Sequence, residues 1–196
     1  MRLQTMGMAL VVGVVALSVA TEARADARDE VVAAFRRAMS ESSYRMHVEV
    51  ANKRGPVHTR IDVQLPNRFH LRSNEVEFIS IASVAYIQAG GRWTRVPVDM
   101  SSQLQGFRIT DLEQAASALT NVVTGSEEDV KGCMSRVYRY QTSSTTAGRS
   151  SQHEAELAIC QVSGLPVRLR SAPTVKGEAV TIHYDYAAKI DIRAPQ

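Results

Sequence analysis

Polar and apolar residues alternate one by one through long stretches of this chain, and this period of two restricts its fold more than any other feature. The alternation runs through residues 44–50 and again through residues 57–65, on either side of a segment with turn composition at residues 52–56. Because successive side chains of a strand point to opposite faces, each stretch predicts a strand with one apolar and one polar face. Together they predict an antiparallel hairpin.

Eight further segments have strand character and are separated by turns or polar loops. They are residues 68–72, 75–81, 84–88, 92–96, 129–142, 152–162, 167–171 and 178–186. The short spacing of the earlier ones is typical of a meander, in which each strand pairs with its sequence neighbour. The chain is therefore expected to form a mainly antiparallel sheet.

Two segments have a helical pattern instead. Residues 26–40 carry an apolar stripe that includes Val31 and Phe35, which predicts an amphipathic N-terminal helix. Residues 110–125 open with the capping box Thr110-Asp111-Leu112-Glu113 and close at Gly125, with Leu112 and Leu119 on the apolar side. This second helix is rich in small residues, so it can lie close to a sheet.

The first 25 residues have the features of a cleavable export signal. Arg2 precedes an uncharged, largely apolar run at residues 6–20, and Ala23-Arg24-Ala25 follows as a signal-peptidase site. The dense apolar part is shorter than the ~20 residues that a membrane-spanning helix needs, although a retained anchor is the alternative. No Cys follows the run, so no acylated cleavage site is expected. We expect residues 26–196 to form one soluble periplasmic domain that does not span the membrane after cleavage.

The charge pattern argues against nucleic-acid binding. The formal net charge is +3, and Lys and Arg are scattered along strand-like segments. A nucleic-acid-binding surface would concentrate them on one face.

The chain contains two cysteines, Cys133 and Cys160. In an oxidising compartment the default expectation is a disulfide between them. If they face each other across an antiparallel pair, the hairpin is centred between Thr146 and Ala147, inside the polar loop of residues 143–150. Two buried free thiols, or a redox role, are the alternatives.

Several short motifs follow one another in a characteristic order. They are residues 65–72 (Leu-Pro-Asn-Arg-Phe-His-Leu-Arg), a short strand ending in Tyr86, residues 90–93 (Gly-Gly-Arg-Trp), residues 129–133 (Asp-Val-Lys-Gly-Cys) running into residues 137–140, and residues 164–169 (Gly-Leu-Pro-Val-Arg-Leu). In this order and spacing, the chain resembles the periplasmic lipoprotein-carrier superfamily of the LolA, LolB and outer-membrane-lipoprotein-sorting type. The similarity covers most of residues 26–196.

The resemblance implies an α+β fold: one strongly curved antiparallel sheet of about 10 to 11 strands, an incomplete half-barrel whose open face is covered by helices. It also implies an apolar cavity that takes up acyl chains, each buried methylene contributing roughly 0.8 kcal/mol. The expected partners are a lipid or an acylated lipoprotein, with an envelope protein as acceptor. Cavity-facing arginines recur among such carriers, and Arg45 and Arg68 are the candidates here.

The candidate ligand-cavity residues are large apolar or aromatic side chains, for which ordinary core packing is the alternative. They are Tyr44, Met46, Val48, Ile61, Val63, Phe69, Phe78, Tyr86, Trp93, Leu112 and Leu119. Trp93 follows Gly90-Gly91 and is a candidate ligand platform.

Nothing in the sequence predicts a metal, a cofactor or catalysis. The chain has five histidines without a short ligand motif, although His47 and His58 would share the polar side of the first hairpin. Ser163-Gly164-Leu165 is a turn rather than a nucleophile elbow, and there is no glycine-rich strand-to-helix loop. We therefore expect a carrier that is not an enzyme. An envelope protein-interaction or stress-sensing domain with the same fold is the first alternative, and a hydrolase or redox protein using a cysteine is the second.

Overall fold

One antiparallel sheet dominates the structure. The computed structural model describes residues 19–96, 116–146, 149–174 and 177–195. Its elements are α1 (Val19–Ser40), β1 (Ser43–Val50), β2 (Val57–Gln64), β3 (Arg68–Ser73), β4 (Glu77–Ile81), β5 (Val84–Ala89), β6 (Arg92–Val96), β7 (Leu119–Val130), β8 (Cys133–Thr146), β9 (Arg149–Cys160), β10 (Pro166–Pro173) and β11 (Val180–Asp185). All eleven strands belong to a single sheet, and every neighbouring pair is antiparallel.

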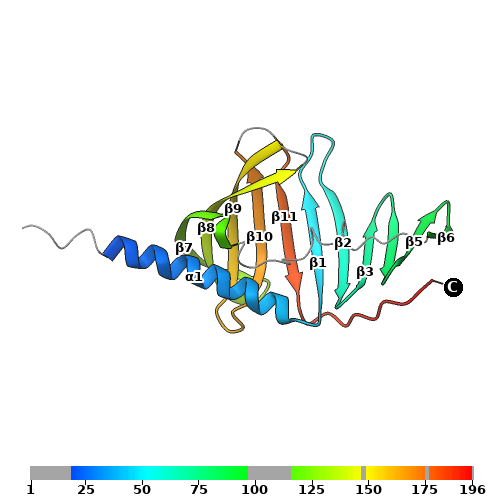
Figure 1. Ribbon diagram of the computed structural model, residues 1–196, viewed down its shortest axis with the longest axis horizontal. Coiled ribbons are helices and arrows are strands. Elements are labelled where there is room, and N and C mark those ends of the chain that lie inside the picture. Colours follow the sequence, from blue (N-terminus) through cyan, green and yellow to red (C-terminus); the bar gives the residue numbers. More distant parts are fainter. Residues whose placement is uncertain (1–18, 97–115, 147–148, 175–176, 196) are drawn as a thin grey trace, which may run out of the picture.

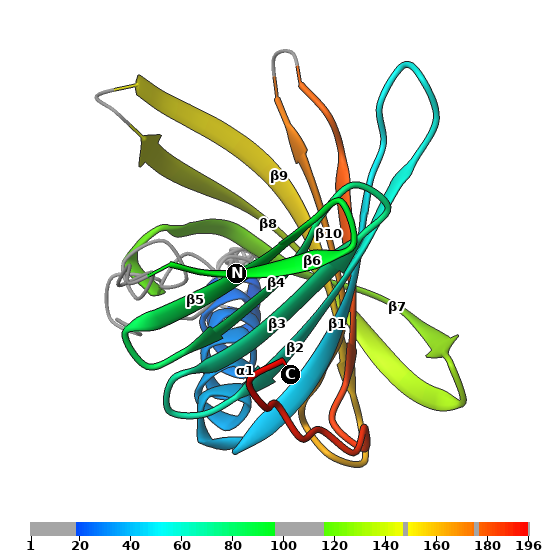
Figure 2. The same cartoon turned by 90° about the vertical axis from the view of Figure 1, so that its right-hand side faces the viewer.

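The strand order shows two meanders joined side by side. It runs β6-β5-β4-β3-β2-β1-β11-β10-β9-β8-β7, so β1 pairs with β11 in the middle and the sheet does not close. Figure 2 shows the strong twist of this sheet, and Figure 1 shows α1 lying across the strands of the second meander. The main contacts of α1 are with β7, β9 and β10. Below, the face of the sheet that carries α1 is called the inner face and the opposite one the outer face.

The N-terminal helix is longer than predicted. Its buried side comprises Ala27, Val31 and Ala34, whose i, i+4, i+7 spacing places them on one stripe. The helix is already formed at Val19, the first residue that the structure describes, rather than starting at residue 26, and three of the seven residues before Asp26 are alanines, the best helix formers. All three buried positions lie after the predicted cleavage site.

The C-terminal part of the second predicted helix is wrong: residues 116 and 117 are helical, but the chain is a strand from Leu119 onward. Residues 110–115, with Leu112, lie outside the described part of the chain, and Leu119–Val130 is strand β7. Breaks in the β7–β8 register fall between Thr120 and Val123 and between Thr124 and Glu127, and Asn121 has a φ of 54°. Such bulges let residues three apart, here Leu119 and Val122, be buried together, which imitates a helical period. The described residues contain one long helix, so the expectation of several helices over the open face is not confirmed.

The segment predicted as one strand at residues 129–142 is interrupted by a tight turn. β7 ends at Val130, and Lys131 and Gly132 follow with φ of 52° and 86°, the combination of a two-residue type I′ hairpin. The Asp129 carboxylate accepts a hydrogen bond from the Gly132 amide (2.9 Å). β8 then starts at Cys133.

The predicted disulfide is present, but its register differs by two residues. Cys133 and Cys160 are bonded with their Cα atoms 5.7 Å apart. The direct partner of Cys160 in the β8–β9 ladder is Ser135, so Cys133 reaches it diagonally from beyond the end of the ladder. Diagonal neighbours two residues apart on one face remain close enough to be bridged.

Candidate functional site

The apolar side chains of the inner face form two separate clusters. The covered cluster lies under α1 and consists of Ala27, Val31, Ala34, Leu119, Val122, Tyr138, Tyr140, Ala155, Leu157 and Ile159, with Val32, Phe35 and Leu169 packed against it. The open cluster lies on β1–β4 and β11, away from the main contacts of α1, and extends to Leu65 just after β2. It consists of Met46, Ile61, Val63 and Phe69, with Tyr44, Val48, Leu65, Leu71, Phe78, Ile182 and Tyr184 packed against them.

Strand register explains why the open cluster is continuous. One row of successive cross-strand partners runs over Met46, Ile61, Leu71 and Phe78. A parallel row joins Tyr44, Val63 and Phe69. Partners directly opposite on one face have their Cβ atoms about 5 Å apart, so these rows merge into one apolar surface. Its floor is buried, whereas the side chains packed around that floor keep partial access to solvent.

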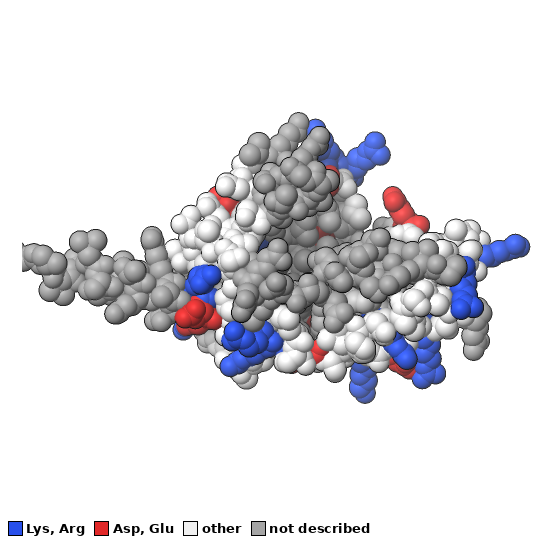
Figure 3. Space-filling view, in the orientation of Figure 1, with Lys and Arg blue, Asp and Glu red and all other residues white. Residues whose placement is uncertain are grey.

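Three tyrosines stand beside this surface. The Tyr44 and Tyr186 rings lie 5.9 Å apart between centroids, and the Tyr184 and Tyr186 rings stack at 6.2 Å. Burial raises the pKa of Tyr184 and of Tyr186, yet both residues remain partly exposed. These rings therefore combine extensive burial with partial access to solvent. In Figure 3, the visible Lys and Arg side chains lie towards the margins of the molecule.

The structure brings most of the predicted cavity residues together. The open cluster contains Tyr44, Met46, Val48, Ile61, Val63, Phe69 and Phe78. Leu119 belongs to the covered cluster instead. Tyr86 and Trp93 lie on the outer face. Phe78 and its partner Ile87 face inward, so their sequence neighbours Ile79 and Gln88 face outward. Tyr86 is the direct partner of Ile79, and Trp93 is the direct partner of Gln88.

Neither candidate arginine points to the open cluster. Arg45 lies on the outer face and binds both carboxylate oxygens of Asp62, at 2.5 and 3.0 Å. Arg68 donates to the Ile192 carbonyl (2.9 Å) and so holds the C-terminal segment against the end of the sheet. The expectation of a cavity-facing Arg at either position is therefore corrected.

Sequence reasoning missed the contribution of β11. Ile182 and Tyr184 complete the open cluster, and Tyr186 extends its aromatic edge. The alternation within residues 178–186 carried the signal for which side chains share a face. What the alternation did not reveal is that this strand pairs with β1.

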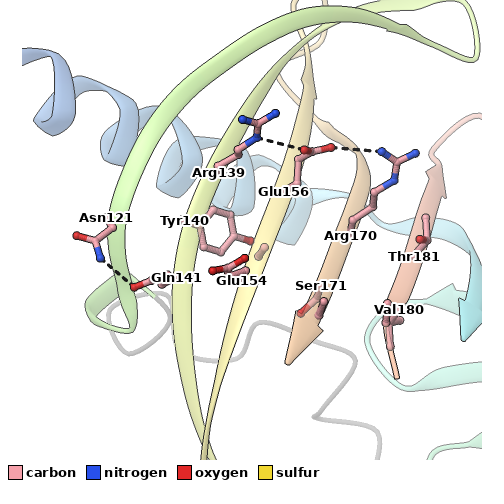
Figure 4. Close-up of a pocket in the computed structure, with 13 residues that line it drawn as sticks. Asn121, Arg139, Tyr140, Gln141, Glu154, Glu156, Arg170, Ser171, Val180 and Thr181 are labelled. Atoms are coloured by element: carbon pink, nitrogen blue, oxygen red, sulfur yellow. Dashed lines mark hydrogen bonds and ion pairs between the residues drawn. The ribbon is translucent and has the colours of Figure 1, made fainter. Parts of the chain in front are cut away.

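The outer face carries a network of paired charges over β8–β10. Over β7–β11 it carries a pocket of about 560 Å³, shown in Figure 4. There Glu156 lies between Arg139 and Arg170, with N···O distances of 3.4 Å to each, and also binds the buried Arg168 at 2.9 Å. These ion pairs satisfy one another and present no nucleophile activated by a base.

The described residues give no sign of a metal centre or a membrane span. They contain no group of three His, Cys, Asp or Glu side chains placed to hold a metal ion. His47 and His58 share the outer face as expected, but His47 faces Arg60 and His58 faces Glu49. Among the same residues, no helix combines the length and apolarity that crossing a membrane requires.

Comparison with known proteins identifies the fold. No family model matches the chain, and no curated protein matches its sequence significantly. Among solved structures, the lipoprotein LppX of Mycobacterium tuberculosis superposes with a TM-score of 0.64 at 13% identity, covering 86% of this chain and 99% of LppX. LprF from Mycobacterium bovis gives 0.65 at 13% identity, covering 87% and 97%. The MucA/MucB complex of Pseudomonas aeruginosa gives 0.51 at 16% identity, covering 81% of this chain and 55% of that one.

At these identities the likenesses establish the fold alone. The curved, open sheet with its N-terminal helix is that of LppX and LprF along nearly their whole length. The architecture that the resemblance implies, one curved antiparallel sheet that does not close, is thus confirmed, and it is the fold of LppX and LprF.

Proposed function

We propose that this protein is an exported, non-enzymatic carrier that binds the acyl chain of a lipid or lipoprotein on the open cluster. The observation that carries the proposal is the open cluster itself, a continuous apolar surface whose rim keeps solvent access. An apolar ligand laid on it would remove both surfaces from water at about 25 cal/mol per Å². The tyrosines suit such a site, because each has an apolar ring and a polar tip.

The proposed address is the periplasm, reached through a signal peptide at residues 1–25. Cleavage there would shorten α1 but keep Ala27, Val31 and Ala34, which hold the helix on the sheet. The mature domain, residues 26–196, would then retain its covered cluster. In this proposal the free chain exchanges its ligand with an envelope protein acceptor.

A test of this proposal begins with the protein as the cell exports it. Full-length precursor is expressed, and the mature protein is isolated from the periplasm without detergent and weighed by native mass spectrometry. We expect bound species that extract as lipid, and saturable binding of a dansylated fatty acid after their removal. Phe78→Glu would put an unpaired charge into the open cluster and should weaken probe binding by about tenfold or more.

Val162→Glu is the matched control, because Val162 is 92% exposed in the turn after β9 and accepts the same charge in water. It should leave probe affinity unchanged. A ligand-free native mass together with absence of probe binding would contradict the proposal, as would equal effects of the two variants.

Binding of a polypeptide is the second candidate function. The neighbour MucB is seen in complex with MucA, and an apolar surface of this kind also fits an extended chain. A stable, lipid-free protein complex recovered from the same periplasmic preparation, and lost in Phe78→Glu, would favour this candidate.

A further inference from the structure

A row of basic side chains crosses the outer face at a single level of the sheet. Its members are successive cross-strand partners on β10, β11, β1, β2 and β3: Arg168, His183, His47, Arg60 and Arg72. Like charges directly opposite one another destabilise a sheet. Arg60 and Arg72 are such a pair, so their placement side by side is not explained by folding.

Only the two ends of the row are neutralised. Arg168 forms ion pairs with Glu128 and Glu156, at 2.5 and 2.9 Å, and Arg72 binds Glu77 at 2.6 Å. None of the three central residues forms an ion pair with any residue that the structure describes. The middle of the row therefore keeps its unsatisfied donors and its capacity for positive charge.

A pocket of about 480 Å³ opens above this middle section. Its polar lining is His47, Glu49, His58, Thr59, Arg60, Arg72, Ser73, Asn74 and His183. Glu49 is the one carboxylate in that lining, and it lies 3.7 Å from His58, with both side chains more than half exposed. On β2, the carboxylate of Asp62 lies two residues beyond Arg60 and forms an ion pair with Arg45.

The environment of His183 reflects the surplus of positive charge. Burial lowers the pKa of His183, and the charges of Lys131, Arg168, Arg170 and His47 lower it further. Its Nδ1 atom is buried without a hydrogen-bond partner among the described residues. The charged and titratable groups around His47 and His183 are Arg168 and Arg170 on β10, Lys131 in the β7–β8 turn, Arg45 and Glu49 on β1, His58, Arg60 and Asp62 on β2, and Asp185 on β11.

We propose that this outer-face pocket binds a phosphate group through Arg60, His47 and His183. Neighbouring strands lie about 4.8 Å apart, so the three side chains span roughly 10 Å, enough for one or two phosphate groups. A guanidinium fork and imidazolium donors form strong, charge-assisted hydrogen bonds to phosphate oxygens. A metal ion does not suit the pocket, because two of its basic side chains are arginines, which cannot act as ligands.

This site is separate from the open cluster, which lies on the other face of the same strands. It does not depend on the proposed carrier function. The phosphate has two chemical sources, a phospholipid headgroup at a membrane surface or a free phosphate compound. Binding should weaken as pH rises through the titration of His183, because only the imidazolium carries positive charge.

The test follows the imidazole Cε1 proton signals of the mature protein during titration with inorganic phosphate and pyrophosphate at slightly acidic pH. We expect saturable shifts of the His47 and His183 signals and a rise in the pKa of His183 on binding. Arg60→Gln should weaken the binding about tenfold or more, since it removes a charged hydrogen-bond donor. Arg95→Gln, an exposed outer-face arginine on β6, should leave the affinity unchanged.

Vesicle binding distinguishes the two sources. Retention on phosphatidylglycerol vesicles but not on phosphatidylcholine vesicles, with competition by pyrophosphate, assigns the site to a lipid headgroup. Saturable phosphate binding without vesicle binding assigns it to a free compound. The proposal is overturned if neither binds, or if Arg60→Gln and Arg95→Gln behave alike. His47→Gln, checked by its melting temperature, provides the same test should Arg60→Gln fail to fold.

Discussion

The two clusters of the inner face are made of similar strands and differ in what covers them. In the covered cluster Leu157 and Val31 are fully buried and Tyr138 is 2% exposed, because α1 packs on β7, β9 and β10. The open cluster has a buried floor as well, with Val63 at 0% exposed, but the side chains packed against that floor, Phe78, Ile182 and Tyr184 among them, keep solvent access. The disulfide and the tight β7–β8 turn also lie in the covered half.

This difference suggests a division of labour within one sheet. Complete burial and a covalent link favour stability, whereas partly exposed apolar side chains add less to folding and remain available to a ligand. This division would be contradicted if the same substitution in the two halves changed stability and ligand affinity equally.

The largest expected effect comes from an identical change in each half. Leu157→Ala in the covered cluster should lower the free energy of unfolding by about 2 to 5 kcal/mol, since the side chain has no exposed surface. Leu71→Ala in the open cluster should cost about 1.5 kcal/mol or less, because Leu71 is partly exposed. Urea unfolding measures both.

Ligand binding should show the reverse order. Leu71→Ala should change the affinity for the dansylated fatty acid, and Leu157→Ala should not, below its melting temperature. Equal losses of stability in the two variants would contradict the proposed division.

The disulfide gives the next largest effect and sharpens the same comparison. Cys133→Ser or Cys160→Ser opens a link across a separation of 27 residues and should destabilise the protein by about 2 to 4 kcal/mol. Reductant should lower the melting temperature of the wild type to about that of the Cys→Ser variants, and it should leave the melting temperature of the variants unchanged. Probe binding well below the melting temperature should persist, because the bond lies outside the open cluster.

The sequence predicted the first meander well and the second less well, for physical reasons. In β1 and β2 the alternation is strict, and the turns throughout β1–β6 are short, so local pattern determines both strands and pairing. In β7 the bulges at Thr120–Val123 and Thr124–Glu127 shift the spacing of the buried side chains from two residues towards three. Periodicity alone then favours a helix.

The residues of the candidate site were predicted correctly where the alternation within one strand shows which side chains share a face. They were missed where that assignment depends on which strands pair and in what register. Tyr86 was grouped with Phe78, but a two-residue turn joins Ile81 to its partner Val84 and so reverses which parity faces inward. The same limit hid Tyr184, because β1 pairs with β11 across most of the chain length. The basic row of the outer face draws one residue from each of five strands, so it becomes visible only with the register known.

The smallest predicted effect concerns the ion pairs on the outer face of the open half. Glu77 accepts a hydrogen bond from Arg72 (2.6 Å), and its carboxylate lies 2.7 Å from the His70 ring. The bond from Arg72 is the main cause that lowers the pKa of Glu77 from its ordinary value of 4.5; burial opposes the shift and His70 adds to it. Since the folded-state pKa is the lower one, the stabilisation is complete above about pH 4.5 and is lost as pH falls through the lowered pKa.

Replacing Glu77 by Gln should therefore reduce stability near pH 7 by about 1 kcal/mol or less, as is usual for partly exposed pairs. The difference in melting temperature between wild type and Glu77→Gln should vanish as pH falls below the lowered pKa of Glu77, where the wild-type carboxylate is also protonated. Glu75→Gln, in the exposed turn before β4, is the matched control and should show little difference at either pH. A deficit for Glu77→Gln that stayed constant with pH would mean that packing, rather than charge, sets the contribution of this residue. The open half would then depend on side-chain packing on both of its faces, and the contrast with the covered half would weaken.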